Sequence, residues 1–498
     1  MRLAGSGALR PRRRIETAFG PFCRTHWLFL ALLAVAVVMR VLVTVAFRPG
    51  LELYGDSYAY LKDASHLRQG GFHPMGYAVF LRALFWTHYT VVIVAIQHLL
   101  GLLAGVATYV AVRRLDARPW LAAIASAPVL LDGYQMDVEQ FVLSDTVFLV
   151  LILAACLLVL APRRPGVVTC AVAGLLIAAA TLTRGLGLAV LLPVLCYALV
   201  ARFGWRRTVA LGACAVIPVL GYMGRFTQTH HQFALESTDG LWLYGRTAYF
   251  ASCAPLPAAE RAICPHVPLS MRLSPEAYTW SKYASPLYLR YPPKERPRQG
   301  KKFAYAVIRR EPLGYLRTTL DGLIRDVAPV RTNIWWAWNV HAWQMSPIIH
   351  ARKTNTTLAA GTILASRNAH HPFREKVRAA SPAAFTSGYQ KIVWTPGPTL
   401  PLALLIVLLA LVRRRQERRV WVAAALAAAG VLLMLVPALT EVQDYRYMLP
   451  VQALLWPAGA LAADALLRRS GAGEASEVDP QSPRVSGKPS PSGVTLDS

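Results

Sequence analysis

Positions 27–47 read WLFLALLAVAVVMRVLVTVAF, an apolar run interrupted by one charged residue, Arg40. A helix needs about 20 apolar residues to cross the hydrocarbon core of a bilayer, so this run predicts a membrane-spanning helix. The run is too long for the apolar part of a signal peptide, and no small-residue cleavage site follows it. We therefore expect it to be retained as a first span.

Similar runs recur along the chain, which is 55% hydrophobic and only 16% charged. A soluble protein carries about 25% charged residues. The runs together predict an all-α, polytopic transmembrane helix bundle of about ten spans with a large extracytoplasmic loop domain. The run at 120–131 is short and contains Pro128, so we expect it to be tilted, kinked or incompletely inserted. The predicted spans are Trp27–Phe47, Thr90–Val112, Trp120–Leu131, Glu139–Ala161, Val167–Thr183, Leu188–Phe203, Thr208–Gly224, Thr399–Val412, Val420–Leu439 and Met448–Leu467.

Basic residues in the short loops predict how these helices are oriented. Cytoplasmic loops collect Lys and Arg, and the alternation of basic clusters places both termini in the cytoplasm. The net charge of +27 then favours anionic membrane lipids as partners and argues against nucleic acid, because the charge is divided among short loops. The clusters are Arg10–Arg14, Arg113/Arg114/Arg118, Arg163/Arg164, Arg202/Arg206/Arg207, Arg413–Arg415 with Arg418/Arg419, and Arg468/Arg469.

This topology divides the chain into five regions. They are a basic cytoplasmic N-terminus (1–26), a transmembrane bundle (27–224) with its first outer loop at 48–89, an extracytoplasmic loop domain (225–394), C-terminal transmembrane helices (395–469) and a disordered cytoplasmic tail (470–498). The loop domain holds 23 basic and 9 acidic residues. Because Cys253 and Cys264 are the only cysteines outside, we expect a disulfide between them. The cysteines show no metal-ligand spacing.

Within the loop domain, apolar residues recur at helical spacing from Leu313 to Val327, and a tryptophan cluster follows at 335–343. One interpretation is a helix packed in a small domain. The other is an interfacial helix that shapes a lipid-facing cleft, because tryptophans favour the headgroup level.

The first outer loop contains a conspicuous group of polar and aromatic residues. Asp56 is followed by Tyr58 and Tyr60, and the sequence GGFHPMGY, with its His73-Pro74 turn, begins the next apolar helix. A solvated loop carboxylate is the simpler interpretation of Asp56 alone. The neighbouring Tyr58 and Tyr60 and the His73-Pro74 turn favour a functional site.

These motifs resemble those of lipid-phosphate-dependent glycosyltransferases with the GT-C fold, such as the protein mannosyltransferases and the aminoarabinose transferase of lipid A. The resemblance covers roughly residues 27–225 and the last span, and it is loose in the long loop around REPLGY at 310–315. The further matching motifs, in chain order, are LSDTVF (143–148), with Asp145 where the family has Glu, TRG (183–185), with Arg184, and YRYMLP (445–450), with Tyr445 and Arg446.

The resemblance implies an inverting transfer of sugar from a polyprenyl-phosphate donor to an acceptor hydroxyl on the outer face. A carboxylate takes the acceptor proton, and we assign this role to Asp56. Arginines stabilise the phosphate of the leaving lipid, a role that fits Arg184 and Arg446. Ser57 stands where many members have a second acid, which argues against a paired-acid or metal-bridged site. We expect no required cofactor, with a divalent metal left open.

The remaining candidates for substrate binding are Tyr58, Tyr60, His73, Asp145 and Tyr445. Asp145, placed about two turns inside the fourth span, could equally form a hydrogen bond or ion pair within the bundle. His73 could form the turn or contact the acceptor. We expect Arg40 to be paired in the bundle or to extend outward, and Gln97 and His98 to join helices.

Two other functions remain open on sequence alone. A transporter or lipid flippase would show repeats and charges near the midplane of the membrane, whereas the charges here lie at the outer ends of spans. A non-catalytic cell-envelope assembly protein would not need Asp56, Arg184 and Arg446 to converge. The sequence does not identify the sugar, the lipid carrier or the acceptor, which could be a protein, a glycolipid or a polysaccharide.

Overall fold

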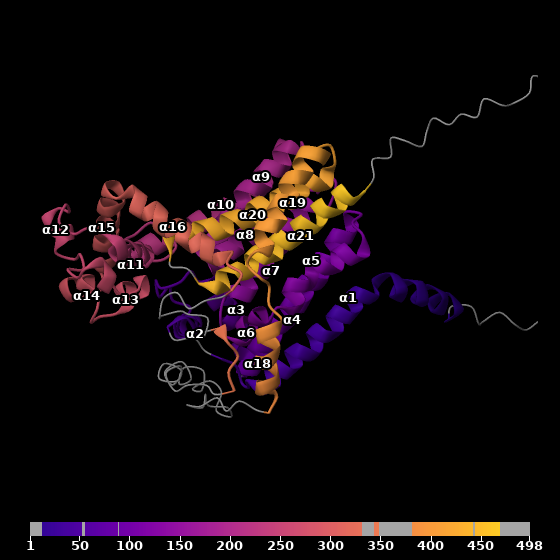
Figure 1. Ribbon diagram of the computed structural model, residues 1–498, viewed down its shortest axis with the longest axis horizontal. Coiled ribbons are helices and arrows are strands. Elements are labelled where there is room, and N and C mark those ends of the chain that lie inside the picture. The colour runs from indigo at the N-terminus through magenta and orange to yellow at the C-terminus, as the bar shows by residue number, and fades with distance from the viewer. Residues whose placement is uncertain are drawn as a thin grey trace, which may run out of the picture.

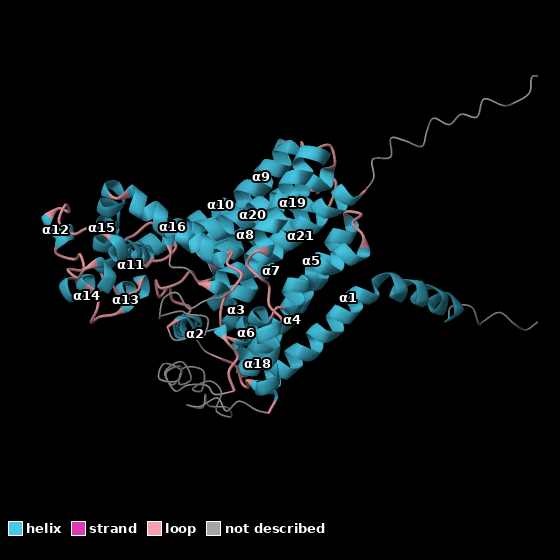
Figure 2. Ribbon diagram, viewed as in Figure 1, coloured by secondary structure: helices cyan, strands magenta, loops and turns pink. Residues whose placement is uncertain are grey.

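The computed structural model describes residues 12–51, 55–87, 89–330, 343–347, 381–441 and 444–468. Within these ranges the protein is built of helices, and one isolated bridge joins Leu51 to Phe141 (Figures 1 and 2). The predicted all-α class is therefore confirmed. The expected tail at 470–498 and most of the tryptophan cluster lie outside the described residues.

Every predicted span overlaps a helix of the bundle. Among the described residues, five helical segments are long and apolar enough to cross a membrane, namely Gly20–Ala46, Thr90–Arg114, Trp205–His230, Arg418–Thr440 and Tyr445–Leu467. The short apolar helix predicted around Pro128 is present as well. The bundle helices are α1 (Arg12–Ala46), α4 (Thr90–Arg114), α5 (Pro119–Leu131), α7 (Asp145–Leu160), α8 (Val167–Thr183), η2 (Gly185–Val190) continuing into α9 (Leu191–Val200), α10 (Trp205–His230), α19 (Thr399–Arg414), α20 (Arg418–Thr440) and α21 (Met448–Leu467).

Shorter helices cover one end of this bundle or form a group beside it. Figure 1 shows α11 to α16 together on one side of the bundle. The shorter helices are α2 (Asp56–His66), α3 (Gly76–Leu84), η1 (Phe85–Thr87), α6 (Gly133–Gln140), α11 (Asp239–Phe250), α12 (Ala258–Arg261), η3 (Leu269–Met271), α13 (Pro275–Trp280), α14 (Pro286–Arg290), α15 (Arg296–Arg310), α16 (Pro312–Asp326), α18 (Pro382–Ile392) and η6 (Tyr445–Tyr447).

The fourth span begins later than predicted. Helix α6 ends at Gln140, Phe141 is extended, and α7 starts only at Asp145. The side-chain amide of Gln97 holds the break open by donating to the carbonyl oxygens of Glu139 (2.8 Å) and Phe141 (2.7 Å). Asp145 is therefore the first residue of its helix, and the prediction that it lies two turns inside was wrong.

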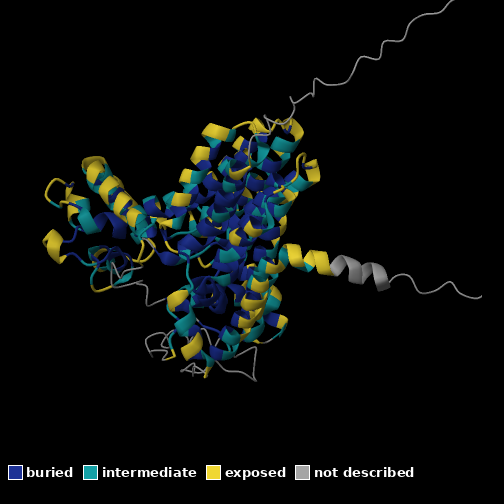
Figure 3. Cartoon of the chain, turned by 45° about the vertical axis from the view of Figure 1, so that its right-hand side comes forward, coloured by how far each residue is buried: buried dark blue, intermediate teal, exposed yellow. Residues whose placement is uncertain are grey.

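Buried polar residues pair inside the bundle, whose interior is shown dark in Figure 3. Arg40 donates to the Glu139 carboxylate from Nε (2.8 Å) and Nη2 (2.9 Å). His98 Nδ1 lies 2.8 Å from the same carboxylate, and Gln135 donates to it at 3.0 Å. The expected pairing of Arg40, and the helix-joining roles of Gln97 and His98, are confirmed.

Basic side chains gather at one end of the bundle. Arg418 donates to the carbonyl oxygen of Leu160 (2.7 Å), which ends α7. The backbone N–H of Arg118 donates to the Asp464 carboxylate (3.1 Å), which also pairs with Arg468 (2.9 Å). The predicted basic loops around Arg118, Arg163, Arg418 and Arg468 thus lie together, as the expected alternation requires, while the side chains of Arg10–Arg14 lie outside the described part of the chain. Which membrane face they occupy stays a prediction.

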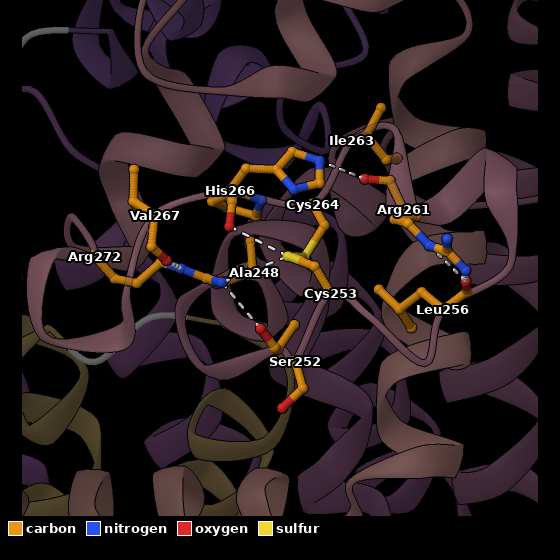
Figure 4. Close-up of a disulfide and its surroundings, with 12 residues drawn as sticks. Ala248, Ser252, Cys253, Leu256, Arg261, Ile263, Cys264, His266, Val267 and Arg272 are labelled. Carbon is orange, nitrogen blue, oxygen red and sulfur yellow. Dashed lines mark hydrogen bonds between the residues drawn. A yellow bond between two sulfur atoms is a disulfide. The ribbon is translucent and has the colours of Figure 1, made fainter.

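The group α11 to α16 has its own apolar core, which includes Tyr244, Cys264 and Phe303. The predicted disulfide between Cys253 and Cys264 is confirmed (Figure 4). Beside it, Arg272 donates to the carbonyl oxygen of Ala251 at 3.0 Å.

This group is attached to the bundle at the end of α20. Arg246 of α11 donates to the carbonyl oxygen of Glu441 (2.8 Å), and Tyr315 of α16 donates to that of Leu439. Helix α16 confirms the predicted apolar periodicity, and several of its apolar side chains are exposed, including Leu313 and Ile324.

Candidate active site

Asp56 is the first residue of α2, and the residue before it determines how the chain enters that helix. Gly55 has φ +87°, a positive value that residues other than glycine rarely adopt. The Asp56 carboxylate lies 2.9 Å from Arg446 Nη2 through one oxygen and 3.5 Å from His73 Nε2 through the other. The outer-loop acid, the His-Pro turn and the late arginine therefore meet, although almost 400 residues of sequence separate the first from the last.

Arg446 and Arg184 form a chain of charges with the neighbouring carboxylates. Arg184, the C-cap of α8, pairs with Asp145 at the start of α7. Arg446 lies 3.8 Å from the other oxygen of Asp145 and 3.0 Å from Asp444. Two guanidinium groups and three carboxylates are thus held at the end of the bundle opposite the basic loops.

Aromatic rings hold these charged groups in place. The ring of Tyr60 stacks on His73 with centroids 4.4 Å apart, and its hydroxyl lies 2.9 Å from that of Ser144. The guanidinium of Arg184 lies 4.7 Å from the ring centroid of Tyr447, within the range of a cation–π contact. Such packing restricts the rotamers of the charged side chains and preorganises the site.

Asp56, Arg184 and Arg446 line a cavity of about 420 Å³, which we call the first cavity. One wall is apolar and comes from the ends of spanning helices, with Met223 of α10, Val436 of α20 and Leu186 of η2. Polar residues line the cavity as well, including Glu236, Asp239, Lys301 and Glu441. The cavity therefore offers both apolar and charged contacts.

The carboxyl groups of the cavity have different proton affinities. Burial would raise the pKa of Asp56, but the Arg446 guanidinium and His73 outweigh it, so this pKa lies below its usual range. Burial raises the pKa of Asp444 to about 6 against the opposing effect of Arg446. Burial, with Asp239 and Glu441 nearby, raises the pKa of Glu236 well above its usual value. Asp56 thus gives up its proton more readily than an ordinary carboxyl group, whereas Glu236 holds its proton more tightly.

The structure brings six predicted site residues together and leaves two outside. The six are Asp56, Tyr60, His73, Asp145, Arg184 and Arg446. Tyr58 lies two positions after Asp56 on a helix, and therefore on another face, whereas Tyr60 lies four positions after it. Tyr445 is buried beside a separate small space that includes Gln452. The Ser57 hydroxyl donates to the carbonyl oxygen of Val142 (2.9 Å), away from the cavity.

Sequence reasoning missed other residues of this site. Glu236 and Glu441 lie in loops without periodicity and Asp239 is the first residue of α11, so no sequence pattern pointed to them. Asp444 could have been found, because it precedes Arg446 by two positions. Trp343, whose ring centroid lies 5.2 Å from the Arg446 guanidinium, belonged to the tryptophan cluster assigned to the membrane surface. In the described ranges no group of three or more His, Cys, Asp and Glu residues is placed to hold a metal ion.

The fold and the site together define a polytopic helical membrane protein with a charged cavity at one end of its bundle. No family model and no curated protein matches the sequence.

Two solved structures of an archaeal oligosaccharyltransferase from Archaeoglobus fulgidus are similar in overall arrangement. One is tethered to an acceptor peptide (TM-score 0.40, 13% identity, 89% of this chain covered), and the other is AglB with an inhibitory peptide and a dolichol-phosphate (0.40, 14%, 88%). The match covers 50% of each of those chains, so this protein spans about half their length. At this level the similarity concerns helix arrangement alone, and the function below rests on the site.

Proposed function

We propose that this protein is a membrane glycosyltransferase that moves a sugar from a polyprenyl-phosphate donor to an acceptor hydroxyl on the extracytoplasmic face, with inversion at the anomeric carbon. The observation that carries the proposal is the convergence of Asp56, Arg184 and Arg446 on one cavity that has an apolar, bundle-side wall. An assembly protein without catalysis would not require this convergence. Charges at a helix-bundle end, rather than at its midplane, also argue against a transporter.

We place the donor in the first cavity in a single orientation. Its isoprenoid chain would lie along Met223, Leu186 and Val436, and its phosphate would reach Arg184 and Arg446. Arginine suits this contact because its planar fork bonds two phosphate oxygens at once. The anomeric carbon would then lie between the arginines and Asp56.

In the transfer step the acceptor oxygen attacks the anomeric carbon and forms the new glycosidic bond. The bond from that carbon to the phosphate oxygen breaks, and the lipid phosphate leaves with the electron pair, stabilised by both arginines. The acceptor proton passes to the Asp56 carboxylate. The sugar changes its configuration because the attack comes from the face opposite the leaving group.

Donor binding would also prepare the base. In the unliganded site Asp56 is paired with Arg446 at 2.9 Å, and a carboxylate with so low a pKa is a weak base. A donor phosphate competes for the same guanidinium and weakens its attraction to Asp56. Burial then raises the pKa of the carboxyl group, so that the base becomes stronger when the donor is present.

The test is a transfer assay with membranes that contain this protein and a panel of radiolabelled polyprenyl-phosphate sugars. We expect one donor to lose its sugar to an acceptor in wild-type membranes and to remain intact in membranes with the Asp56→Asn variant at equal expression. Failure of every donor in the panel, with native membrane acceptors present, would contradict the proposal.

A further inference from the structure

A second cavity of about 840 Å³ adjoins the first. It lies between the chain that follows α10, residues 229–240, and the start of α15, residues 293–301. The two cavities share the wall formed by Phe233, Glu236, Asp239 and Lys301. The two cavities are thus neighbours on either side of these residues.

The two cavities differ in what surrounds them. The first has a wall of bundle residues from α10, α20 and η2, whereas the second meets the bundle only at the last residues of α10. Its outer side is well defined, because α11 and α15 pack so closely that a Cβ atom added to Gly240 would overlap the carbonyl oxygen of Pro297. The first cavity thus adjoins the bundle, and the second adjoins the surface of the α11–α16 group.

Basic residues concentrate at the second cavity. The segment 290–310 contains eight Lys and Arg residues and one acid, Glu295. Lys294, Arg298 and Lys301 line the cavity, and among the described residues no carboxylate forms a salt bridge with Lys294 or Arg298. The other acids of the cavity are Glu236 and Asp239, and burial raises the pKa of both.

We infer that the second cavity is the acceptor site and that it takes an anionic saccharide, one whose phosphate or carboxylate is held by Lys294 and Arg298 while its hydroxyl passes the shared wall toward Asp56. The inference rests on the function proposed above. The exposed ring of Phe233 on the shared wall offers a face on which a sugar ring can stack. A solvated basic helix would account for the charges but not for their position around a cavity that adjoins the active site.

Binding of labelled trisaccharides to the purified full-length protein tests this inference without requiring turnover. The probes are fluorescent maltotriose, the same trisaccharide with a terminal phosphate, and one with a terminal uronic acid. All are measured with polyprenyl phosphate at saturation, so that the arginines of the first cavity are already occupied. We expect at least one anionic probe to bind about tenfold more tightly than the neutral one, the size of one charge-assisted hydrogen bond.

Two double variants distinguish a site from general positive charge. Lys294→Gln with Arg298→Gln should abolish the preference for the anionic probes. Arg309→Gln with Arg310→Gln removes the same charge from the other, exposed end of α15 and should leave the preference intact.

Three results would overturn the inference: equal binding of neutral and anionic probes, equal loss in both double variants, or tighter binding of a Ser/Thr-rich peptide that ignores Lys294 and Arg298. Because the polyprenyl phosphate affinity is measured in the same samples, an intact donor site with no acceptor preference would refute this inference alone. Loss of donor binding in the wild-type protein would instead count against the proposed function.

Discussion

Two networks of buried charge lie in this bundle, and they are built differently. In the first, the Glu139 carboxylate accepts from Arg40, His98 and Gln135, and Glu139 lines neither the first nor the second cavity. In the second, Asp145 pairs with Arg184 and shares Arg446 with Asp56, and one buried oxygen of Asp145 has no hydrogen-bond partner among the described residues. A network that only holds helices together satisfies all of its members, whereas one that binds a ligand keeps some capacity free.

The largest effect on folding should come from the closed network. Arg40→Met leaves the Glu139 charge buried without its main partner, and we expect a loss of about 3–5 kcal/mol in the free energy of unfolding. The double variant Arg40→Met/Glu139→Gln should lose less than the sum of the two single changes, because the pair is removed together. Denaturant titration in mixed micelles measures both.

A matched control for this experiment lies at the basic end of the bundle. Glu417 pairs with Arg419 and is 31% exposed at its side chain, so Glu417→Gln should cost less than about 1 kcal/mol. If Arg40→Met cost no more than this control, the Arg40–Glu139 pair would not differ from a surface pair and the comparison would fail.

The arginines of the site should affect ligand binding more than folding. Arg184→Gln and Arg446→Gln each remove a charge-assisted contact with the donor phosphate, and we expect about ten- to hundredfold weaker binding of polyprenyl phosphate. Arg206→Gln, at the opposite end of the bundle and exposed, is the control. Unchanged affinity in both site variants would show that the donor phosphate does not bind to these two arginines.

A smaller effect concerns pH. The pKa of Asp56 is lower in the folded protein than in the unfolded chain, where it is about 3.9. The ionised carboxylate therefore contributes to stability above about pH 3.9, and this contribution is lost as the pH falls through the pKa of the folded state. In Arg446→Gln, only His73 remains to counter burial, which raises the pKa of Asp56. We expect the acid limb of kcat/KM for Asp56 to move to higher pH by about one to three units.

The measurement is the pH profile of the transfer reaction in the wild type and in the variant. Burial raises the pKa of Asp444 to about 6, so this group titrates in the same range. The variant Asp444→Asn therefore serves as the control for its contribution. An acid limb that stays in place in Arg446→Gln and moves in Asp444→Asn would assign the limb to Asp444.

The sequence predicted the bundle well because apolar runs report directly on membrane helices. The end of α6 at Gln140 was not predicted, because hydropathy does not show that the Gln97 side chain donates hydrogen bonds to the carbonyl oxygens of Glu139 and Phe141. The length of the run at 139–161 therefore concealed the break before Asp145.

The charged centre of the site was predictable because each member lies beside a helix end in a recognisable motif. The assignment of Tyr58 had no support in the structure, because spacing two places it on another face of α2 than Asp56. Glu236, Asp239 and Lys301 could not be predicted, since only the packing of α11 against α15 brings these residues to the cavity.

The most direct test of the central claim compares transfer and donor binding in one variant. Asp56→Asn preserves the shape of the side chain and removes the base, so transfer should fall by about 10² to 10⁴. The affinity for polyprenyl phosphate should stay equal or increase, because the donor phosphate no longer has to compete with the Asp56 carboxylate, 2.9 Å away, for Arg446. Near-normal transfer by a well-folded Asp56→Asn protein would contradict the role of Asp56 as the base.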